Sequence, residues 1–305
     1  MSRTYPMFET IQVEQILEVL KRQTTDEKEI EAEMKGSQEP TISGKSLWLA
    51  AHLMDAHVNE FDVNERDGVI SLYAINSSHT ALLTMQVGTE SLEWEPEYQY
   101  EINAKNLKES LKNHKKTTKK QTDMLRLNHM SRFTTEDGNK RGLYAGFEGA
   151  EGSIEFAERT NGLWKPNEVK VDFNDGLILD REEFMKAAKA MKFVSSVPKV
   201  MYDPTQNAED VVFSAKGVHD NITARVACVP VDGQYDLANN NLKDQPWDVD
   251  FAVEYLKPLQ RLPKNAAISL AFAGSNMPIQ FDFSGEEGGT PYCGRLLIAP
   301  RVEEY

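Results

Sequence analysis

Lysine residues are concentrated in one short stretch of a chain that is acidic as a whole. Between Lys105 and Lys120 there are seven lysines and a single acidic residue, Glu109. Ammonium groups at this density can neutralise the phosphates of a nucleic acid without reading its sequence. The formal net charge of −14 at pH 7 argues against a protein that binds nucleic acid over its whole surface. The stretch therefore indicates a local phosphate-binding surface or an ordinary solvated helix face with a loop, and both interpretations stay open.

Residue types that catalyse reactions or bind metals are present without the spacing that such chemistry needs. The six histidines form no H-E-x-x-H pattern, and Cys228 and Cys293 form no C-x-x-C pair, which suits a reducing compartment. Gly44-Lys45-Ser46 could end a phosphate-binding loop, but that loop requires glycine at the position of Glu39. We predict no catalytic residues, no metal site and no cofactor, and hence no enzyme.

A β-hairpin is predicted over Asp67–Val87. Two runs rich in Val, Ile, Leu, Tyr and Thr flank the cluster Asn76-Ser77-Ser78, whose side-chain oxygens can bond nearby backbone and turn the chain. His79 lies at the corner, with Ile75 and Leu82 close by. The turn thus carries a polar tip beside an apolar patch, or simply a surface histidine.

The other elements follow from periodicity and capping signals. Helices are predicted from Ser43 or Gly44 to Met54, from an Asn103 cap to about His114, over Asp180–Lys192, and near Val253–Leu262, where Pro258 is tolerable only in a first turn. The predicted strands are 30–35, 58–63, 97–102, 123–130, 141–147, 152–158, 177–179, 199–202, 210–215, 221–229, 247–251, 266–272, 278–283 and 295–300.

The chain is predicted to be internally duplicated. Tyr100–Lys108 (YEINAKNLK) and Val249–Lys257 (VDFAVEYLK) share one strand-to-helix pattern. We predict an α+β protein with an N-terminal extension, two similar domains and a connector, with sheets outside and four helices on one shared face. The expected bounds are 1–29 for the extension, 30–158 for the first domain, 159–176 for the connector and 177–305 for the second domain.

No apolar run approaches the roughly 18 residues of a membrane span, and no leader is recognisable. We expect a soluble intracellular protein, in the cytoplasm of a prokaryotic host or the nucleus of a eukaryotic one.

The hairpin segment Asp67–Leu82 (DGVISLYAINSSHTAL) resembles the first-domain hairpin of the proliferating cell nuclear antigen family, the DNA sliding clamps of eukaryotes, archaea and many of their viruses. The segments Asn276–Phe283 (NMPIQFDF) and Leu296–Val302 (LLIAPRV) resemble the family's closing strands and tail. Glu183–Lys189 (EFMKAAK) is similar to its second-domain helix. The resemblance covers about Ile30 to Val302.

Some positions depart from the family pattern. Asn76 stands where aspartate is usual, residues 1–29 have no obvious counterpart, and the tail ends early at Tyr305. Met7-Phe8-Glu9 resembles the usual opening of the family, so the first strand could lie there instead. The departures indicate a divergent clamp, with a viral or an archaeal origin both left open.

The resemblance implies the DNA-clamp fold, in which two domains of antiparallel sheets each contribute two helices to a central channel. It also implies a homotrimeric ring around double-stranded DNA, which tethers DNA polymerase and other partners and is placed by a clamp loader. The residues expected to face DNA are Lys108, Lys112, Lys186, Lys189, Lys257 and Arg261. The residues expected to form a pocket for partner peptides are Ile75, His79, Leu82, Pro278, Leu297, Ile298, Ala299 and Pro300. The residues expected at the subunit interface are Ile154, Phe156, Ile222 and Ala224.

One alternative function remains. A scaffold of the same fold could recruit repair or transcription factors without being the replicative processivity factor. Processive synthesis by the cognate polymerase on primed circular DNA would separate the two.

Overall fold

A computed structural model describes residues 41–66, 69–92, 98–112, 124–133, 141–149, 152–157, 171–173, 176–230 and 246–301. The chain divides into two units, Met1–Glu39 and Pro40–Tyr305, and all described residues belong to the second. The strand predicted at 30–35 lies outside the described residues. So do most of the predicted connector 159–176, residues 231–245, and residues 113–123, which include the second half of the lysine-rich stretch.

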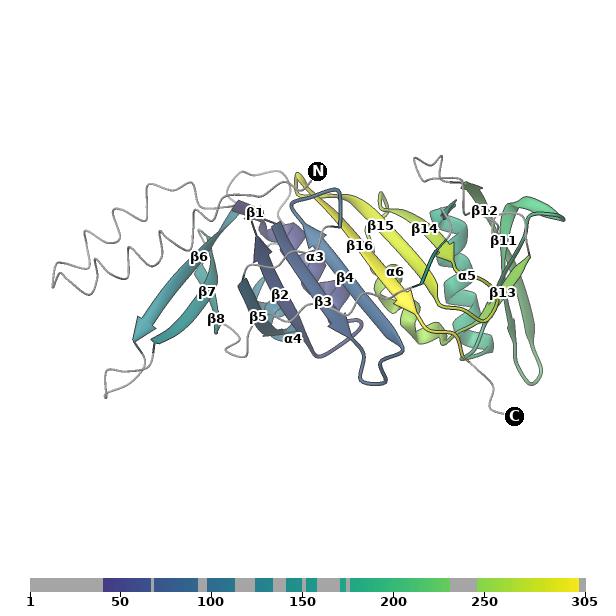
Figure 1. Cartoon of the computed structure of the whole chain (residues 1–305), viewed down its shortest axis with the longest axis horizontal. Helices are drawn as coiled ribbons and strands as arrows, with labels where there is room; N and C mark the ends of the chain where they lie inside the picture. The colour runs from purple at the N-terminus through teal and green to yellow at the C-terminus, as the bar shows by residue number, and fades with distance from the viewer. Residues whose placement is uncertain are drawn as a thin grey trace. The chain divides into compact units, whose positions relative to one another are not determined.

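The described elements form two series of the same kinds in the same order (Figure 1). The first series is β1 (Thr41–Ser43), α3 (Gly44–Met54), β2 (Glu60–Arg66), β3 (Val69–Ile75), β4 (Ala81–Val87), β5 (Tyr98–Asn103), α4 (Ala104–Ser110), β6 (Met124–Phe133), β7 (Arg141–Gly149) and β8 (Gly152–Ala157). The second is β9 (Leu177–Leu179), α5 (Arg181–Val194), β10 (Lys199–Asp203), β11 (Asn207–Lys216), β12 (Asn221–Pro230), β13 (Trp247–Asp250), η4 (Val253–Leu256) with α6 (Lys257–Gln260), β14 (Ala267–Phe272), β15 (Ile279–Glu287) and β16 (Thr290–Ile298). The predicted duplication is confirmed at the level of element order; the exact domain bounds remain a prediction.

Local capping signals explain where three helices begin. The side chains of Ser43, Asn103 and Asp180 accept hydrogen bonds from the backbone N–H groups of Ser46, Asn106 and Glu183, at the first turns of α3, α4 and α5. Each bond satisfies a donor that a helix start leaves unpaired. The starts predicted for these helices are therefore confirmed.

Pro258 has its effect at the fourth helix. The helical segment changes from the 3-10 turn η4 to the short helix α6 at Lys257, so Pro258 lies in the first turn of α6. Proline lacks an N–H group, but the first turn of a helix does not use one. The predicted tolerance of Pro258 is confirmed.

The strands form two antiparallel sheets. The four-stranded sheet has the order β1-β6-β7-β8, and the twelve-stranded sheet has the order β13-β10-β11-β12-β9-β14-β15-β16-β4-β3-β2-β5. The two series meet where β16 pairs with β4, with Ile298 opposite Ala81 and Tyr292 opposite Val87. Strand β1 was not predicted, and it is held by its ladder with β6 rather than by a recognisable local pattern.

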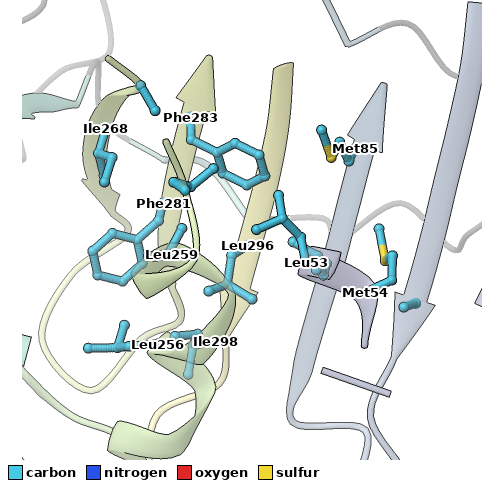
Figure 2. Close-up of a cluster of buried hydrophobic side chains, with 14 of the residues drawn as sticks. Leu53, Met54, Met85, Leu256, Leu259, Ile268, Phe281, Phe283, Leu296 and Ile298 are labelled. Carbon is cyan, nitrogen blue, oxygen red and sulfur yellow. The ribbon is translucent and has the colours of Figure 1, made fainter. Parts of the chain in front are cut away.

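The helices lie against one face of the large sheet. Helix α3 packs on β4 and β15 and contacts α4 and α6, while α5 packs on β11 and β12 and contacts η4. The core beneath them includes Leu53 from α3, Leu259 from α6, and Phe281 and Leu296 from β15 and β16, all fully buried (Figure 2). Because one cluster takes side chains from both series, their apolar faces are buried together.

No helix in the described ranges is long and apolar enough to cross a membrane.

Candidate functional site

The turn between β3 and β4 is fixed by the side chain of Asn76. Its Oδ1 accepts hydrogen bonds from the backbone N–H groups of Thr80 and Ala81, each at 2.9 Å. Its Nδ2 donates to Ser78 Oγ at 2.8 Å and to Thr80 Oγ1 at 3.1 Å. His79, exposed at the corner, has a positive φ of 57°, a conformation that needs such local support outside glycine. The turn therefore presents His79 from a well-supported backbone.

Two other segments hold this turn. Thr80 Oγ1 lies 2.7 Å from the hydroxyl of Tyr255 in η4, and the backbone N–H of Ala299 donates to the carbonyl of Thr80 at 2.8 Å. The turn, η4 and the segment after β16 thus meet at one end of the sheet. They are far apart in sequence.

Apolar side chains lie beside the turn on the sheet face opposite the helices. Ile75 is directly opposite Leu82, and Leu82 is directly opposite Leu297, so the three point to one face. Leu82 and Leu297 are half-buried, and Ile75 is 38% exposed. Three of the eight residues expected in a peptide pocket therefore form a continuous row.

Ile298 does not belong to this row. Its neighbours along the strand alternate to opposite faces, and Ile298 points to the helix side, where it is fully buried near Leu256 (Figure 2). The expectation that Ile298 contacts a peptide is therefore corrected: it is a core residue.

The remaining expected residues lie at the end of the same strands. Pro278, Ala299 and Pro300 are half-buried and flank the ladder between β15 and β16. Met277 precedes Pro278 and is 41% exposed, and we include it because of this position in the chain. We call the set Ile75, His79, Leu82, Met277, Pro278, Leu297, Ala299 and Pro300 the outer patch.

Helix α5 places two expected basic residues on its solvent side. Lys186 and Lys189 are exposed and, within the described ranges, have no ion-pair partner. Phe193, 88% exposed, falls on the same side at 100° per residue and was not singled out from the sequence. The buried stripe of α5 on the opposite side consists of Phe184, Ala187, Ala188 and Met191.

Two more expected cations are exposed but have weak local partners. Lys112 Nζ lies 3.2 Å from Glu109, and Lys257 Nζ lies 4.0 Å from Glu254, both pairs three residues apart. Exposed pairs of this kind contribute little because solvent screens them. Lys112 and Lys257 therefore remain accessible to another anion.

Lys108 and Arg261 are bound by a carboxylate instead. Lys108 Nζ lies 2.6 Å and Arg261 Nη1 lies 3.1 Å from the same oxygen, Asp55 Oδ2, at the end of α3. Burial by itself raises the pKa of Asp55, but the hydrogen bonds and charges of the two cations outweigh it and lower that pKa below its usual value. We call Asp55, Lys108 and Arg261 the Asp55 cluster; no pattern in the sequence predicts that both cations bind one carboxylate.

Among the described strands, the outer edges of β1, β5, β8 and β13 and part of one edge of β12 have no partner strand, and the expected interface residues lie on two of them, β8 and β12. Strand β8 pairs only with β7, and β12 pairs with β11 along 221–227 while β9 covers only its end, Cys228–Pro230. Ile154 and Phe156 lie in β8. Ile222 and Ala224 lie in β12, where their half-buried side chains pack against the core.

The direction of the backbone groups of β12 follows from its hairpin with β11. The N–H of Gly217 donates to the carbonyl of Asp220, so the bonded pairs alternate from there, and Ile222 and Ala224 bond to β11. The N–H and C=O groups of Thr223 and Arg225 consequently point to the open edge. The edge closes at Ala227, whose N–H donates to Glu183 and whose carbonyl accepts from the N–H of Asp180.

Within the described ranges, no three His, Cys, Asp or Glu side chains lie close enough together to hold a metal ion.

The chain is similar to solved structures of PCNA sliding clamps. It shares 16% identity with a chain in a structure of the C-terminal region of FEN-1 bound to A. fulgidus PCNA, covering 88% of this chain and 99% of that one, with a TM-score of 0.62. With PCNA from Thermococcus kodakaraensis it shares 18% identity, over 86% of this chain and 99% of that one, with a TM-score of 0.57. With a chain in a PCNA2–PCNA3 complex from Sulfolobus tokodaii it shares 13% identity, over 87% of this chain and 100% of that one, with a TM-score of 0.60.

No family model and no curated protein sequence matches the chain. The likeness is therefore one of structure, over nearly the full length of each clamp chain. It agrees with the antiparallel sheets, the helical layer and the repeated element order. The chain has the α+β fold of the PCNA sliding clamps.

Proposed function

We propose that this chain is the subunit of a ring-shaped DNA sliding clamp of the PCNA family, a non-enzymatic protein that encircles duplex DNA and tethers DNA polymerase and other replication or repair proteins. The observation that carries the proposal is the pair of open strand edges, β8 and residues 221–225 of β12, on a chain with the clamp fold.

Open edges are a liability unless they are paired, because their free N–H and C=O groups recruit other strands. Pairing β8 of one subunit with β12 of the next satisfies both edges by a head-to-tail contact. Such contacts close into a ring when the rotation per subunit divides a full turn. Three subunits are expected from the resemblance, and a solved PCNA2–PCNA3 complex with this fold supports assembly between clamp subunits.

The helical layer supplies the DNA-facing surface in this proposal. Lys186, Lys189, Lys112 and Lys257 are exposed on helices or directly after one, in a chain of net charge −14. Cations on the inner surface and acids elsewhere favour DNA inside the ring and disfavour it outside. Because phosphate contacts carry no sequence information, the ring can slide.

The outer patch supplies the docking site in this proposal. It combines the exposed His79 with an apolar row on an antiparallel sheet, which suits a short peptide with hydrophobic anchors. A neighbouring structure is described as the C-terminal region of FEN-1 bound to PCNA, which supports a peptide-like partner. Polymerase and repair partners are expected to bind here.

The deciding experiment combines mass with activity. The purified protein should have the mass of a closed oligomer, and after loading on primed circular DNA by the cognate clamp loader it should make the cognate polymerase processive. A protein that is monomeric at about 10 µM, a concentration well above the dissociation constant expected of a stable interface, would contradict the ring. An oligomer that leaves processivity unchanged while binding repair or transcription factors would support the scaffold function instead.

A further inference from the structure

The Asp55 cluster joins three helical segments from both halves of the chain. Asp55 ends α3, Lys108 belongs to α4, and Arg261 follows α6. Besides Asp55, Arg261 Nη1 donates to the backbone carbonyl of His52 at 2.7 Å. One carboxylate therefore holds two of the six cations that the resemblance assigns to DNA.

Lys108 and Arg261 are less exposed to solvent than Lys186 and Lys189. The side chains of Lys108, Asp55 and Arg261 are only 20%, 19% and 32% exposed. Charge-assisted hydrogen bonds in a partly desolvated place are stronger than ion pairs in open solvent. A phosphate that approaches Lys108 or Arg261 competes with the Asp55 carboxylate for the cation, whereas it meets no such competitor at Lys186 and Lys189.

We propose that Asp55 is a positioning residue that limits how tightly the ring holds DNA, by withholding Lys108 and Arg261 from the phosphates. The proposal rests on the proposed clamp function. It divides the six cations that the resemblance assigns to DNA into two that tie α3, α4 and α6 together and four that meet DNA.

The physical consequence concerns sliding. Each phosphate contact adds affinity and about 0.9 units to the slope of log K against log salt concentration. Two additional contacts per subunit, repeated around a ring, would hold the duplex considerably more strongly. Asp55 keeps the contact weak while using the same charges to fix the helices.

The test is binding of a short fluorescent DNA duplex to assembled rings of confirmed mass, measured by anisotropy over a series of salt concentrations. Asp55→Asn keeps the shape of the side chain and removes the charge that competes with phosphate. We expect tighter binding at low salt and a slope steeper by about 0.9 for each cation released.

Glu109→Gln is the matched control. It removes the same charge from neighbouring α4, but its partner Lys112 is already exposed, so the slope should not change. Equal effects of the two variants would reduce the role of Asp55 to net charge and overturn the proposal. An Asp55→Asn ring that binds like wild type would also overturn it.

A second variant covers failure of Asp55→Asn to assemble. Lys108→Met keeps most of the side-chain stem and removes the charge; the proposal expects the wild-type slope, and a slope flatter by about 0.9 overturns it. The clamp function is tested separately by Lys186→Ala with Lys189→Ala. If wild-type rings do not bind duplex DNA, or if this double variant leaves the slope of log K against log salt concentration unchanged, the assignment of the DNA-facing surface is wrong.

Discussion

The hydroxyl of Tyr255 lies 2.7 Å from Thr80 Oγ1 and 3.4 Å from Ser78 Oγ. Tyr255 belongs to η4, next to the segment that carries Lys257 and Arg261, and Thr80 belongs to the turn that presents His79. The hydrogen bond thus links the helical layer to the outer patch within one subunit. Asn76 Nδ2 donates hydrogen bonds to the same hydroxyl groups of Ser78 and Thr80.

Tyr255→Phe should weaken peptide docking without affecting the ring. Phenylalanine keeps the aromatic group, but Thr80 loses a hydrogen-bond partner. A hydrogen bond of this kind contributes about 0.5 to 1.5 kcal/mol to stability. If the bond keeps His79 in its bound position, the affinity for a peptide from the C-terminus of the cognate polymerase should fall roughly two- to tenfold. Fluorescence titration measures this affinity. Tyr202→Phe is the control, because the hydroxyl of Tyr202 donates to the carbonyl of Ala208 instead. Equal losses of peptide affinity in both variants would show that the Tyr255 hydroxyl has no specific role in docking.

Leu297→Ala should lower peptide affinity, whereas Ile298→Ala should lower the stability of the fold, although the two residues are adjacent. Leu297 is half-buried in the outer patch, so its truncation should remove on the order of 1 to 3 kcal/mol of peptide contact, roughly a ten- to hundredfold loss of affinity. Ile298 is fully buried, so its truncation should lower the free energy of unfolding by about 2 to 5 kcal/mol. Peptide titration and urea denaturation of both variants check this. Docking that fails only in folded Ile298→Ala would invert our assignment of the two faces.

Local signals in the sequence were sufficient for much of the fold. The caps at Ser43, Asn103 and Asp180 and the turn at Asn76 depend on residues within five positions of each other, so sequence alone indicates them. By contrast, Asp55 meets Lys108 and Arg261 at separations of 53 and 206 residues. No pattern along the chain reports that contact.

The tail shows why the outer patch was only partly predicted. Leu296, Leu297 and Ile298 are all apolar, so the alternation that normally identifies the buried face of a strand is hidden. Only the register with β4 and the burial of each side chain separate Leu297 from its neighbours. Family resemblance located the segment but could not decide which way each side chain points.

Acidification should destabilise the protein through His57. Burial lowers the pKa of His57 from its usual 6.5, and the hydrogen bond between its Nε2 and the carbonyl of Ala81 offsets this only in part. The unfolded chain therefore binds the proton more readily. Stability from the neutral ring is fully present above about pH 6.5 and is lost as pH falls through the lower folded pKa.

Thermal unfolding at about pH 7.5 and about pH 5 measures this effect. In His57→Gln, where an uncharged amide replaces the ring, the drop in melting temperature between the two pH values should be smaller than in wild type. His219→Gln is the control, since His219 is exposed in the turn before β12. A drop of the same size in wild type and His57→Gln would assign the acid sensitivity to other groups.

The open edge of β12 gives the sharpest test of the ring, because neighbouring residues direct their N–H groups to opposite sides. Proline at Thr223 removes an N–H that points to the edge, whereas proline at Ala224 removes one that bonds to β11. Thr223→Pro should therefore release monomers whose melting temperature stays near that of the isolated wild-type subunit. Ala224→Pro should instead destabilise the subunit itself, by about 1 to 3 kcal/mol for the carbonyl left unpaired in the ladder. Native mass spectrometry at several protein concentrations, with thermal unfolding of each species, distinguishes the two. A Thr223→Pro protein that still forms the wild-type oligomer would mean that subunits do not join along this edge.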